Sequence, residues 1–261
     1  MVKYKRRLSF RQYLPEKPIK WGIKVWSLCE STTGYMHRFQ VYTRKEEYNT
    51  GKGLTHRVAT DLLGHLQHKN IRVYMDHFYT SPSLFNELRM RGINACGTVQ
   101  SNRKGLPAEL LPKHIKLQKH EFRVAQKEQL SYCIWMDTKP VLLLSIFHDP
   151  TTIGSIDRRN ADGQKEPVQV ARILQDYQMQ MRGVDIYDQM LGYYMIQLRS
   201  QKWWRRLFFY LMIASVYNKY VNVKDSNYKF INDEYQSFQD FVEDLAEVSL
   251  VMSEQEKMPQ F

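Results

Sequence analysis

Asp76 stands where a carboxylate could hold a divalent cation. It follows the hydrophobic run 71–75, which predicts a short strand that ends at this aspartate. Ligands of open α/β sheets gather at the carboxyl ends of strands, so a carboxylate at this place suits a metal ion. The alternative, and the commoner use of such an aspartate, is to shape the loop or cap the next helix.

Asp185 and Asp188 are a second candidate pair, three residues apart in the segment 167–195, which is predicted to be helical. This spacing puts both carboxylates on one face of a helix. Two like charges there are unfavourable unless a positive charge lies between them, and a divalent metal, a lysine or an arginine would each serve. A solvated helix face is the alternative.

The segment 199–206 mixes cationic and aromatic side chains. Such mixtures stack on bases or bind phosphates. The same residues also open an amphipathic helix, in which the spacing of Trp204 and Phe208 is that of core residues. We therefore expect Trp204 and Phe208 in the core. The cations of the segment are expected on the surface: Lys202, Arg205 and Arg206.

Several other chemistries find no support. The sequence contains no glycine-rich phosphate loop and no Gly-x-Ser-x-Gly motif, which argues against nucleotide and serine hydrolysis. The histidines form no zinc pair, and His65 and His68 are expected on the surface. Cys29, Cys96 and Cys133 lie far apart, which argues against a disulfide framework or a cysteine zinc site and favours a reducing compartment.

The net charge of +11 is unevenly distributed. Residues 225–261 hold 2 basic and 9 acidic side chains, whereas residues 1–224 hold 36 basic and 18 acidic ones. A basic body favours an anionic polymer as partner, most commonly nucleic acid, although a merely soluble basic surface is the alternative. The longest apolar run, 207–217, is too short for a membrane span, and no secretory signal is expected.

The elements that must position these residues follow from the hydrophobic periodicity. Strands are predicted over 21–29, 36–43, 71–75 and 93–99, and helices over 54–67 and 82–91. The strand at 36–43 is expected to be the antiparallel partner of 21–29, across a turn at 31–34. Thr55 is expected to cap the first helix, and Ser81-Pro82 to start the second. Alternating helix and strand over 54–99 is typical of an α/β layer with parallel strands. We expect all four strands in one mixed sheet.

The pattern changes after residue 102. Residues 122–136 and 141–147 predict a small β unit, and 149–166 a polar loop. Helices are then predicted over 167–195, 203–221 and 235–251.

Six motifs stand in order along the chain: YLPEKPIKWG at 13–22, MDHFYTS at 75–81, RGINACGTV at 91–99, NRKGLP at 102–107, GVDIYDQ at 183–189 and KWW at 202–204. Their order and spacing resemble those of the piggyBac transposase family over about residues 8–222. The resemblance implies an α/β, RNase H-like catalytic domain of the DD[E/D] transposase type. Its mixed sheet is flanked by helices and is interrupted by a small β-rich insertion domain.

The resemblance also implies a division of the chain. Residues 1–102 would form the first part of the catalytic core, 103–166 the insertion and a linker, and 167–224 the second, helical part. Residues 225–261 would form an acidic C-terminal helix or tail.

The same resemblance implies a metal-dependent reaction on DNA in the nucleus, carried out by a homodimer. Family members cut and rejoin DNA through Mg²⁺ or Mn²⁺ ions held by three aspartates. Asp76 matches the second and Asp185 the third, while Asp188 matches a further functional carboxylate. The carboxylates of Asp76 and Asp185 are expected about 4–8 Å apart, a gap that metals can bridge. The residues expected to bind DNA are Lys104, Arg199, Lys202, Arg205 and Arg206.

One departure from the family pattern shapes the functional expectation. The family's first aspartate precedes a segment like 2–7, and residues 1–15 contain no Asp or Glu. We therefore expect a DNA-binding remnant of a cut-and-paste transposase, a clipped core that no longer cleaves DNA and whose metal binding is weakened or lost. The alternatives are a fragment of an active transposase and a protein-interaction module that keeps only the fold.

Overall fold

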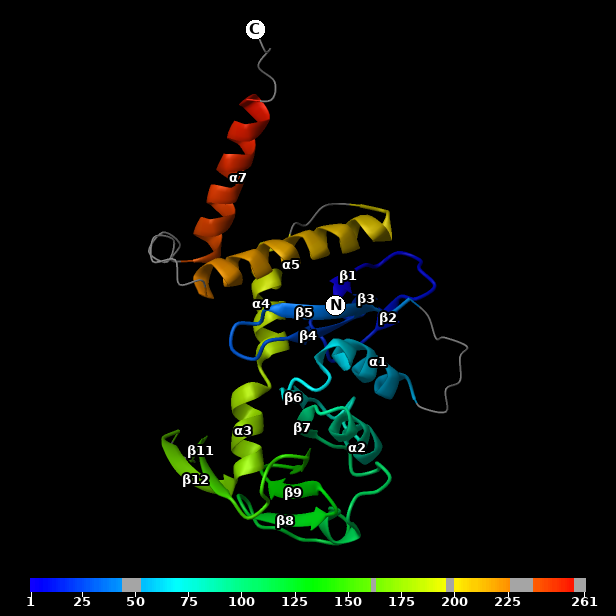
Figure 1. Cartoon of the computed structure of the whole chain (residues 1–261), viewed down its shortest axis with the longest axis vertical. Helices are drawn as coiled ribbons and strands as arrows, with labels where there is room; N and C mark the ends of the chain where they lie inside the picture. The colour runs from blue at the N-terminus through cyan, green and yellow to red at the C-terminus, as the bar shows by residue number, and fades with distance from the viewer. Residues whose placement is uncertain (44–52, 161–162, 196–199, 226–236, 256–261) are drawn as a thin grey trace. The chain divides into compact units, whose positions relative to one another are not determined.

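The computed structural model describes residues 1–43, 53–160, 163–195, 200–225 and 237–255, with side chains described up to residue 247 (Figure 1). The chain divides into two compact units. Met1–Arg44 and Gly183–Phe261 together form one, called here the discontinuous unit, and Lys45–Arg182 form the other, the continuous unit. Each unit contains a hydrophobic core of its own.

The strands of the discontinuous unit form two small antiparallel sheets. β1 (Val2–Lys3), β3 (Trp21–Ile23) and β2 (Gln12–Tyr13) pair in the order β1-β3-β2. β4 (Val25–Cys29) and β5 (Met36–Val41) form a hairpin, which confirms the predicted antiparallel pairing.

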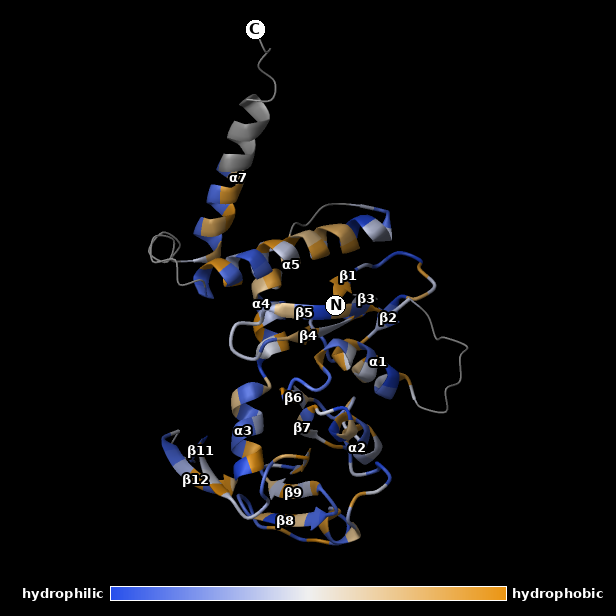
Figure 2. Ribbon diagram, in the orientation of Figure 1, coloured by the Kyte–Doolittle hydropathy of each residue, from blue (hydrophilic) through white to orange (hydrophobic). Residues whose placement is uncertain are grey.

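Among the described residues of this unit, three helices complete it: α4 (Gly183–Tyr194), α5 (Trp203–Asp225) and α7 (Phe238–Gln255). Polar and apolar residues alternate along the coloured part of α7, up to residue 247 (Figure 2). The core is rich in tyrosine, and Tyr187, Tyr217 and Phe238 are all buried within it. Their rings pack mostly edge-on or tilted, an arrangement that aromatic pairs favour.

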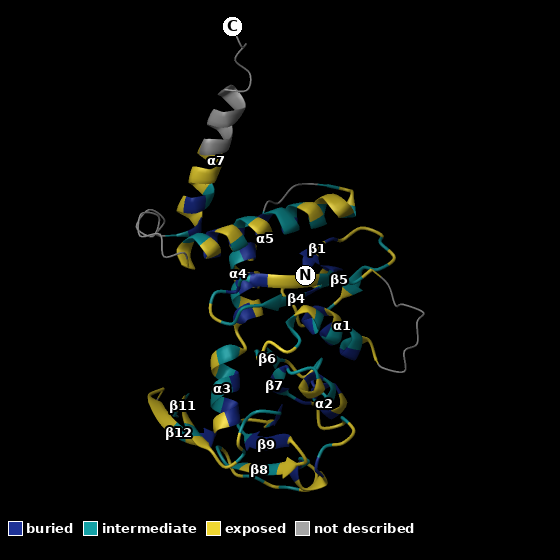
Figure 3. Ribbon diagram, in the orientation of Figure 1, coloured by how far each residue is buried: buried dark blue, intermediate teal, exposed yellow. Residues whose placement is uncertain are grey.

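The expectation that Trp204 and Phe208 lie in the core is wrong. Their side chains are 49% and 57% exposed. The buried face of α5 is formed by Tyr210, Ile213, Ala214, Tyr217, Tyr220 and Val221. Followed back at helical spacing, this face passes through Trp203 and Leu207, which are partly buried. The predicted buried face of this helix was therefore one residue out of register. Figure 3 shows exposed stretches along α5.

The continuous unit contains a five-stranded mixed sheet in the order β6-β7-β10-β9-β8. β6 (Arg72–Met75) and β7 (Asn94–Thr98) are parallel, as predicted. The other strands, which pair antiparallel, are β8 (Phe122–Lys127), β9 (Leu130–Met136) and β10 (Pro140–Ser145).

The expectation that 21–29, 36–43, 71–75 and 93–99 share one sheet is therefore wrong. β6 lies at the edge of the five-stranded sheet. The segment 21–29 divides into β3, which pairs with β1 and β2, and β4, which pairs with β5 in a separate sheet. The second edge of β7 is taken by β10, whose residues 142–145 are all buried. A strand buried on both faces belongs inside a sheet, and helix–strand alternation alone does not reveal this partner. The domain boundaries proposed at 102, 166 and 224 stay a prediction.

The two helices of the predicted α/β layer are present. α2 (Pro82–Met90) begins as expected, because Ser81 Oγ accepts a hydrogen bond from the Leu84 amide at 3.3 Å. α1 (Leu54–Leu63) begins one residue before Thr55, with Gly53 at its N-cap. Thr55 therefore lies in the first turn and does not cap the helix as expected.

The polar loop predicted at 149–166 is largely a hairpin. β11 (Ile153–Arg159) and β12 (Lys165–Ala171) pair antiparallel over their whole length. α3 (Arg172–Gln180) consequently begins after residue 171, not at 167, and α4 is a separate helix. Ile156 and Val168 are paired residues in this hairpin. Because they stand among polar residues, the sequence shows no clear strand pattern here.

Within the described ranges, no helix has both the length and the apolar character needed to cross a membrane.

Candidate functional site

Asp76 is exposed and lies directly after β6, in a loop of fixed geometry. Its Oδ1 accepts a hydrogen bond from the Phe78 amide at 3.1 Å. Its carbonyl oxygen accepts bonds from the amides of Tyr79 and Thr80, and from Thr80 Oγ1 at 2.9 Å. Because Thr80 is fully buried, these bonds tie the backbone of Asp76 to the core of the continuous unit.

Gly97 allows β7 to lie against this loop. It pairs with Met75, the residue before Asp76. A Cβ atom at Gly97 would lie 2.4 Å from both the Met75 carbonyl oxygen and Thr80 Oγ1. Only glycine fits this close approach without displacing the backbone next to Asp76.

Arg103 holds the loop from another side. Its Nη2 donates a hydrogen bond to the Phe78 carbonyl oxygen at 2.9 Å and a longer one, of 3.4 Å, to that of His77. Hydrogen bonds from a charged donor are among the stronger ones in proteins. Arg103 therefore restrains the residues that follow Asp76.

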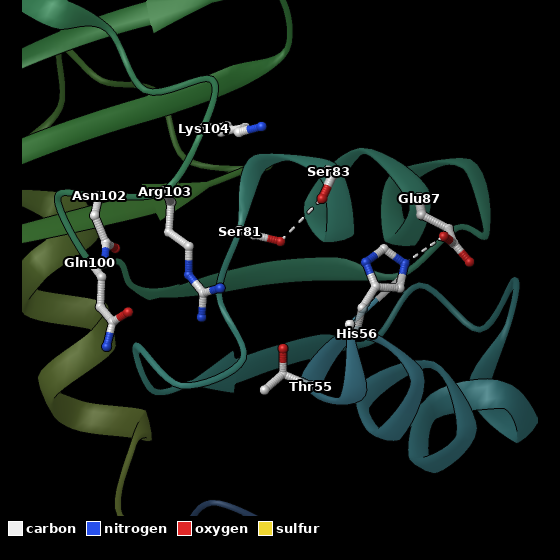
Figure 4. A pocket seen from close by; sticks show the side chains of 10 residues that line it. Thr55, His56, Ser81, Ser83, Glu87, Gln100, Asn102, Arg103 and Lys104 are labelled. Atoms are coloured by element: carbon white, nitrogen blue, oxygen red, sulfur yellow. Dashed lines mark hydrogen bonds and ion pairs between the residues drawn. The ribbon is translucent and has the colours of Figure 1, made fainter. Parts of the chain in front are cut away.

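Beside Arg103 lies a polar hollow of about 630 Å³ (Figure 4). His56 Nε2 and Glu87 Oε2, 2.7 Å apart, join the two helices that flank it. The first turns of α1 and α2 contribute Thr55, Ser81 and Ser83 to its wall. Its remaining side chains come from the segment after β7: Gln100, Asn102, Arg103 and Lys104. Hydroxyl groups, helix N-termini and cations together suit a phosphate group.

Asp185 and Asp188 are both exposed, and Asp185 lies in the first turn of α4. The turn between β4 and β5 determines where this helix begins. A Cβ atom at Gly183 would lie 2.4 Å from the Glu30 carbonyl oxygen. At Gly34, where φ is +75°, it would lie 2.9 Å from the Tyr187 amide nitrogen. The turn and the helix therefore touch backbone to backbone.

Glu30 stabilises this turn. Its carboxylate accepts hydrogen bonds from the backbone amides of Thr32 and Thr33, at 3.0 and 2.6 Å, and from both of their hydroxyl groups. Burial alone would raise the pKa of Glu30, but these hydrogen bonds outweigh burial and lower the pKa to about 2. The carboxylate is therefore ionised whenever the turn is formed at neutral pH.

α5 secures the same turn from the core side. The Tyr217 hydroxyl donates to the Thr33 carbonyl oxygen at 2.6 Å. The Asn218 side chain pairs with the backbone of Met36 in both directions, at 2.9 and 2.8 Å. The start of α4, and with it the position of Asp185 in this unit, is thus set by two strands and a second helix.

Asp188 also acts on its surroundings through charge. Burial, and then the negative charge of Asp188, raise the pKa of the Cys29 thiol to about 12. Cys29 is therefore a neutral thiol beside this carboxylate.

The cationic segment opens α5. Two cations lie near the ring of Trp204, with Arg205 Cζ 5.4 Å and Lys202 Nζ 6.0 Å from its centroid. Lys202 and Arg205 are exposed, as expected, whereas Arg206 is only half-exposed. Lys104, in the continuous unit, is exposed as well. Arg199 lies outside the described residues.

The carboxylates suit the implied metal by their chemistry, since Mg²⁺ prefers oxygen ligands. Asp76 belongs to the continuous unit and Asp185 to the discontinuous one. Their approach to within about 4–8 Å, a gap that metals can bridge, therefore stays a prediction. Among the residues that the structure describes, no three His, Cys, Asp or Glu side chains gather into a metal-binding cluster.

Sequence reasoning missed the residues that hold the aspartates in place, chiefly Glu30, Gly97 and Arg103. Gly97 and Arg103 stand inside two of the six motifs, but nothing in their spacing reveals what they touch. Glu30 stands directly before the turn predicted at 31–34, and a carboxylate ahead of two threonines is a signal for such a turn.

A family model described as Transposase IS4 matches residues 1–220. The human PiggyBac transposable element-derived protein 2 is 26% identical to the chain over 231 residues. The chain belongs to the piggyBac transposase family. The human PiggyBac transposable element-derived protein 3 is 27% identical over 215 residues. These matches cover 84% and 78% of the chain but only 38% and 36% of the relatives, so the chain spans well under half of their length.

A solved structure agrees with this family in fold. It is the cryo-EM structure of a piggyBac transposase synaptic complex with hairpin DNA. The similarity has a TM-score of 0.79 at 23% sequence identity and covers 99% of this chain and 52% of that one. The fold is that of the RNase H-like transposase core, as the sequence motifs implied.

Proposed function

We propose that these residues form the DNA-binding and metal-binding core of a transposase-derived protein of the piggyBac family, acting in the nucleus as a homodimer. Asp76 and Asp185 hold Mg²⁺ or Mn²⁺, and Asp188 is a further functional carboxylate beside them. The main support is that Asp76 and Asp185 are each exposed and held by a rigid frame, within a chain of this family.

The frames suit carboxylates that must stay in place while charge develops on DNA. A bound divalent ion would stabilise the attacking and leaving oxygens of a phosphodiester exchange. Oδ1 of Asp76 accepts the hydrogen bond from the Phe78 amide. Its Oδ2 makes no hydrogen bond to a described residue and can bind a cation. Asp185 is held at the start of α4 by the turn that Glu30 stabilises. Pre-set carboxylates lose little freedom on binding a metal.

DNA would be bound through cations on both units. Lys104 borders the polar hollow, and Lys202 and Arg205 flank the exposed ring of Trp204. Cations attract phosphates, and an exposed aromatic ring can stack on a base. The remaining members of the proposed set are Arg199 and Arg206.

We propose further that the polypeptide 1–261 binds DNA without cutting it. In the family pattern three aspartates act together, and no acid stands among residues 1–15 to serve as the first. Two carboxylates can hold one ion weakly, but the loss of a metal ligand costs more than the 10–100-fold associated with outer-shell partners.

The test combines metal binding with a nicking assay. The purified chain is titrated with Mg²⁺ and Mn²⁺ by calorimetry, then incubated with either ion and DNA carrying candidate transposon ends. We expect weak metal binding that falls in Asp76→Ala and in Asp185→Ala. A matched control, Asp157→Ala, changes an exposed aspartate of β11 and should bind metal as the parent chain does.

Each outcome separates the candidate functions. Nicking that disappears in Asp76→Ala would contradict the non-cleaving proposal and favour an active transposase. If the chain binds no duplex DNA even at low salt, this result would favour the protein-interaction module. DNA binding that weakens steeply as the salt concentration rises, without nicking of the DNA, supports the proposal.

A further inference from the structure

The loop between β1 and β2 carries the sequence Arg6-Arg7-Leu8-Ser9 on the surface of the discontinuous unit. Arg6, Arg7 and Ser9 are all exposed, and Leu8 is half-buried. The sequence contains three Arg-Arg pairs, at 6–7, 158–159 and 205–206. Only the first is followed, two residues later, by a serine or threonine.

The loop is anchored on both sides of this serine. On one side the Tyr4 hydroxyl donates to the Gln201 carbonyl oxygen at 2.6 Å. On the other, the Phe10 ring packs edge-on against Trp203, with 5.2 Å between centroids. Between these anchors the Arg11 amide donates to the Leu8 carbonyl oxygen at 3.2 Å, and the Arg11 side chain donates to the carbonyl oxygens of Lys5 and Arg6. These hydrogen bonds lie within the loop, and opening them would free the segment to extend at modest cost.

The cations of the loop are available to a partner. Lys5, Arg6 and Arg7 form no ion pair with any carboxylate in the described ranges, and the nearest acid in the sequence is Glu16. Arg11 instead donates to the carbonyl oxygens of Lys5 and Arg6. A protein surface with carboxylates at the right spacing could therefore bind Arg6 and Arg7 in bidentate fashion.

We propose that Ser9 is a phosphorylation site for an arginine-directed protein kinase, and that the phosphate weakens DNA binding at the neighbouring start of α5. Such kinases recognise substrates by charge pattern, with carboxylates that bind arginines before the acceptor. Ser9 Oγ attacks the γ-phosphorus of ATP, and the bond to the bridging β–γ oxygen breaks. ADP leaves, and the serine proton passes to the catalytic aspartate of the kinase.

The second part of this inference rests on the proposed function, because it assumes that DNA binds near Lys202 and Arg205. Phosphoserine carries about −1.5 to −2 charges at neutral pH. The packing of Phe10 against Trp203 brings this charge close to the start of α5. The phosphate would also neutralise part of the loop's own cations. DNA affinity should fall several-fold. The slope of the logarithm of the binding constant against the logarithm of the salt concentration should become shallower by about 0.9 for each DNA phosphate that the chain no longer neutralises.

The first experiment maps the modification. The full chain is incubated with a purified arginine-directed kinase and Mg·ATP, and the product is mapped by peptide mass spectrometry. We expect one phosphoryl group on Ser9, absent in Ser9→Ala and retained in Ser101→Ala, which removes an exposed serine without preceding arginines. Arg7→Ala should slow transfer by about tenfold or more, since the kinase can no longer bind a guanidinium group at this position. Absence of transfer, or transfer that persists undiminished in Ser9→Ala, would overturn the site.

The second experiment compares DNA binding of phosphorylated and unphosphorylated chain over a range of salt concentrations. Weaker binding with a shallower salt slope, and none of this change in kinase-treated Ser9→Ala, is the expected result. Equal affinity and slope would overturn the coupling to DNA. If the unmodified chain does not bind DNA at all, the proposed function fails, while the mapping experiment still decides the modification site.

Discussion

At the scale of single residues, Gly97 offers the sharpest test of the frame around Asp76. In Gly97→Ala the new methyl group would meet the Met75 carbonyl oxygen and Thr80 Oγ1 at 2.4 Å. We expect a loss of about 1–3 kcal/mol in the free energy of unfolding, the usual effect of overpacking, measured by urea denaturation.

Gly192 is the matched control for that substitution. It lies in α4 with no neighbouring atom within 4 Å of an added Cβ. Gly192→Ala should therefore stabilise the chain by about 0.5–1 kcal/mol, because glycine is unfavourable inside a helix. Equal effects of the two substitutions would show that the close approach at Gly97 is unimportant.

Arg103 and its neighbour Lys104 should behave differently. Arg103→Ala removes the hydrogen bonds to the loop after Asp76, and should lower the free energy of unfolding by about 1.5–3 kcal/mol. Lys104→Ala should change the free energy of unfolding by less than about 0.5 kcal/mol but should weaken DNA binding. Thermal unfolding and a gel-shift titration measure the two effects. An Arg103→Ala chain as stable as the parent would contradict the role assigned to Arg103.

His148 should make stability depend on pH. Its Nδ1 lies 2.8 Å from Ser145 Oγ and its Nε2 3.0 Å from Asp176 Oδ2. Burial lowers its pKa, although Asp176 acts in the opposite direction. Below about pH 6.5 the unfolded chain therefore takes up this proton more readily than the folded one. Stability should fall as the pH drops below that value and should be regained as it rises.

Chemical denaturation between pH 7.5 and about 5 measures this dependence, in the window set by the ordinary histidine pKa. In His148→Gln, the free energy of unfolding should depend less on pH below about pH 6.5. His114→Gln, at an exposed position, should leave this pH dependence as steep as in the parent chain. Two variants with the same slope would exclude His148 as the cause.

At the scale of helices and strands, hydrophobic periodicity located most elements but not their partners. It located β6, β7, α2 and the β4–β5 hairpin, because each has a clear local pattern. It did not reveal that β10 lies beside β7, since strand pairing depends on contacts distant in sequence. It also placed the buried face of α5 one residue off. Trp203 and Trp204 are the same residue type, and only the packed core decides which of them is covered.

The register of α5 leads to a prediction at this scale. Trp204→Ala should change the free energy of unfolding by less than about 1 kcal/mol, because the ring is half-exposed. It should weaken DNA binding by about 1–3 kcal/mol for one stacked base. Tyr217→Ala, which removes a buried ring and the bond to the Thr33 carbonyl oxygen, should cost about 3–5 kcal/mol of stability. Urea denaturation and DNA titration distinguish these cases. The reverse order of stabilities would show that the helix packs by its other face.

At the scale of the whole molecule, the places of Asp76 and Asp185 in their elements agree with the sequence prediction, whereas the contacts that hold them were not predicted; their role as metal ligands stays a prediction. The end of a strand and the first turn of a helix are visible in sequence, so Asp76 and Asp185 could be placed. The contacts of Glu30 with Thr33, and of Arg103 with Phe78, join loops whose geometry has no periodic signal. The division into two units was not predicted either, because the discontinuous unit is assembled from segments at opposite ends of the chain.

That division predicts how fragments should behave. Lys45–Arg182 is continuous and contains its own sheet and core, so it should fold alone and unfold cooperatively in urea. The fragment 183–261 lacks β1 to β5, against which its helices pack, and should not show a cooperative transition. Circular dichroism of both fragments measures this. A cooperative transition in 183–261 alone would contradict the assignment of its core.

The discontinuous unit also imposes an order on protein synthesis. Its first 44 residues leave the ribosome before the whole of Lys45–Arg182, while the helices that complete their core come afterwards. At about 5–20 residues per second, the delay lasts roughly 7–30 s. During that time the strand edges of the β4–β5 hairpin and residues such as Ile23 have no helix to cover them. A nascent chain of this kind exposes apolar surface to chaperones until the helices after residue 182 have been translated, and a slow codon in that segment would prolong the exposure.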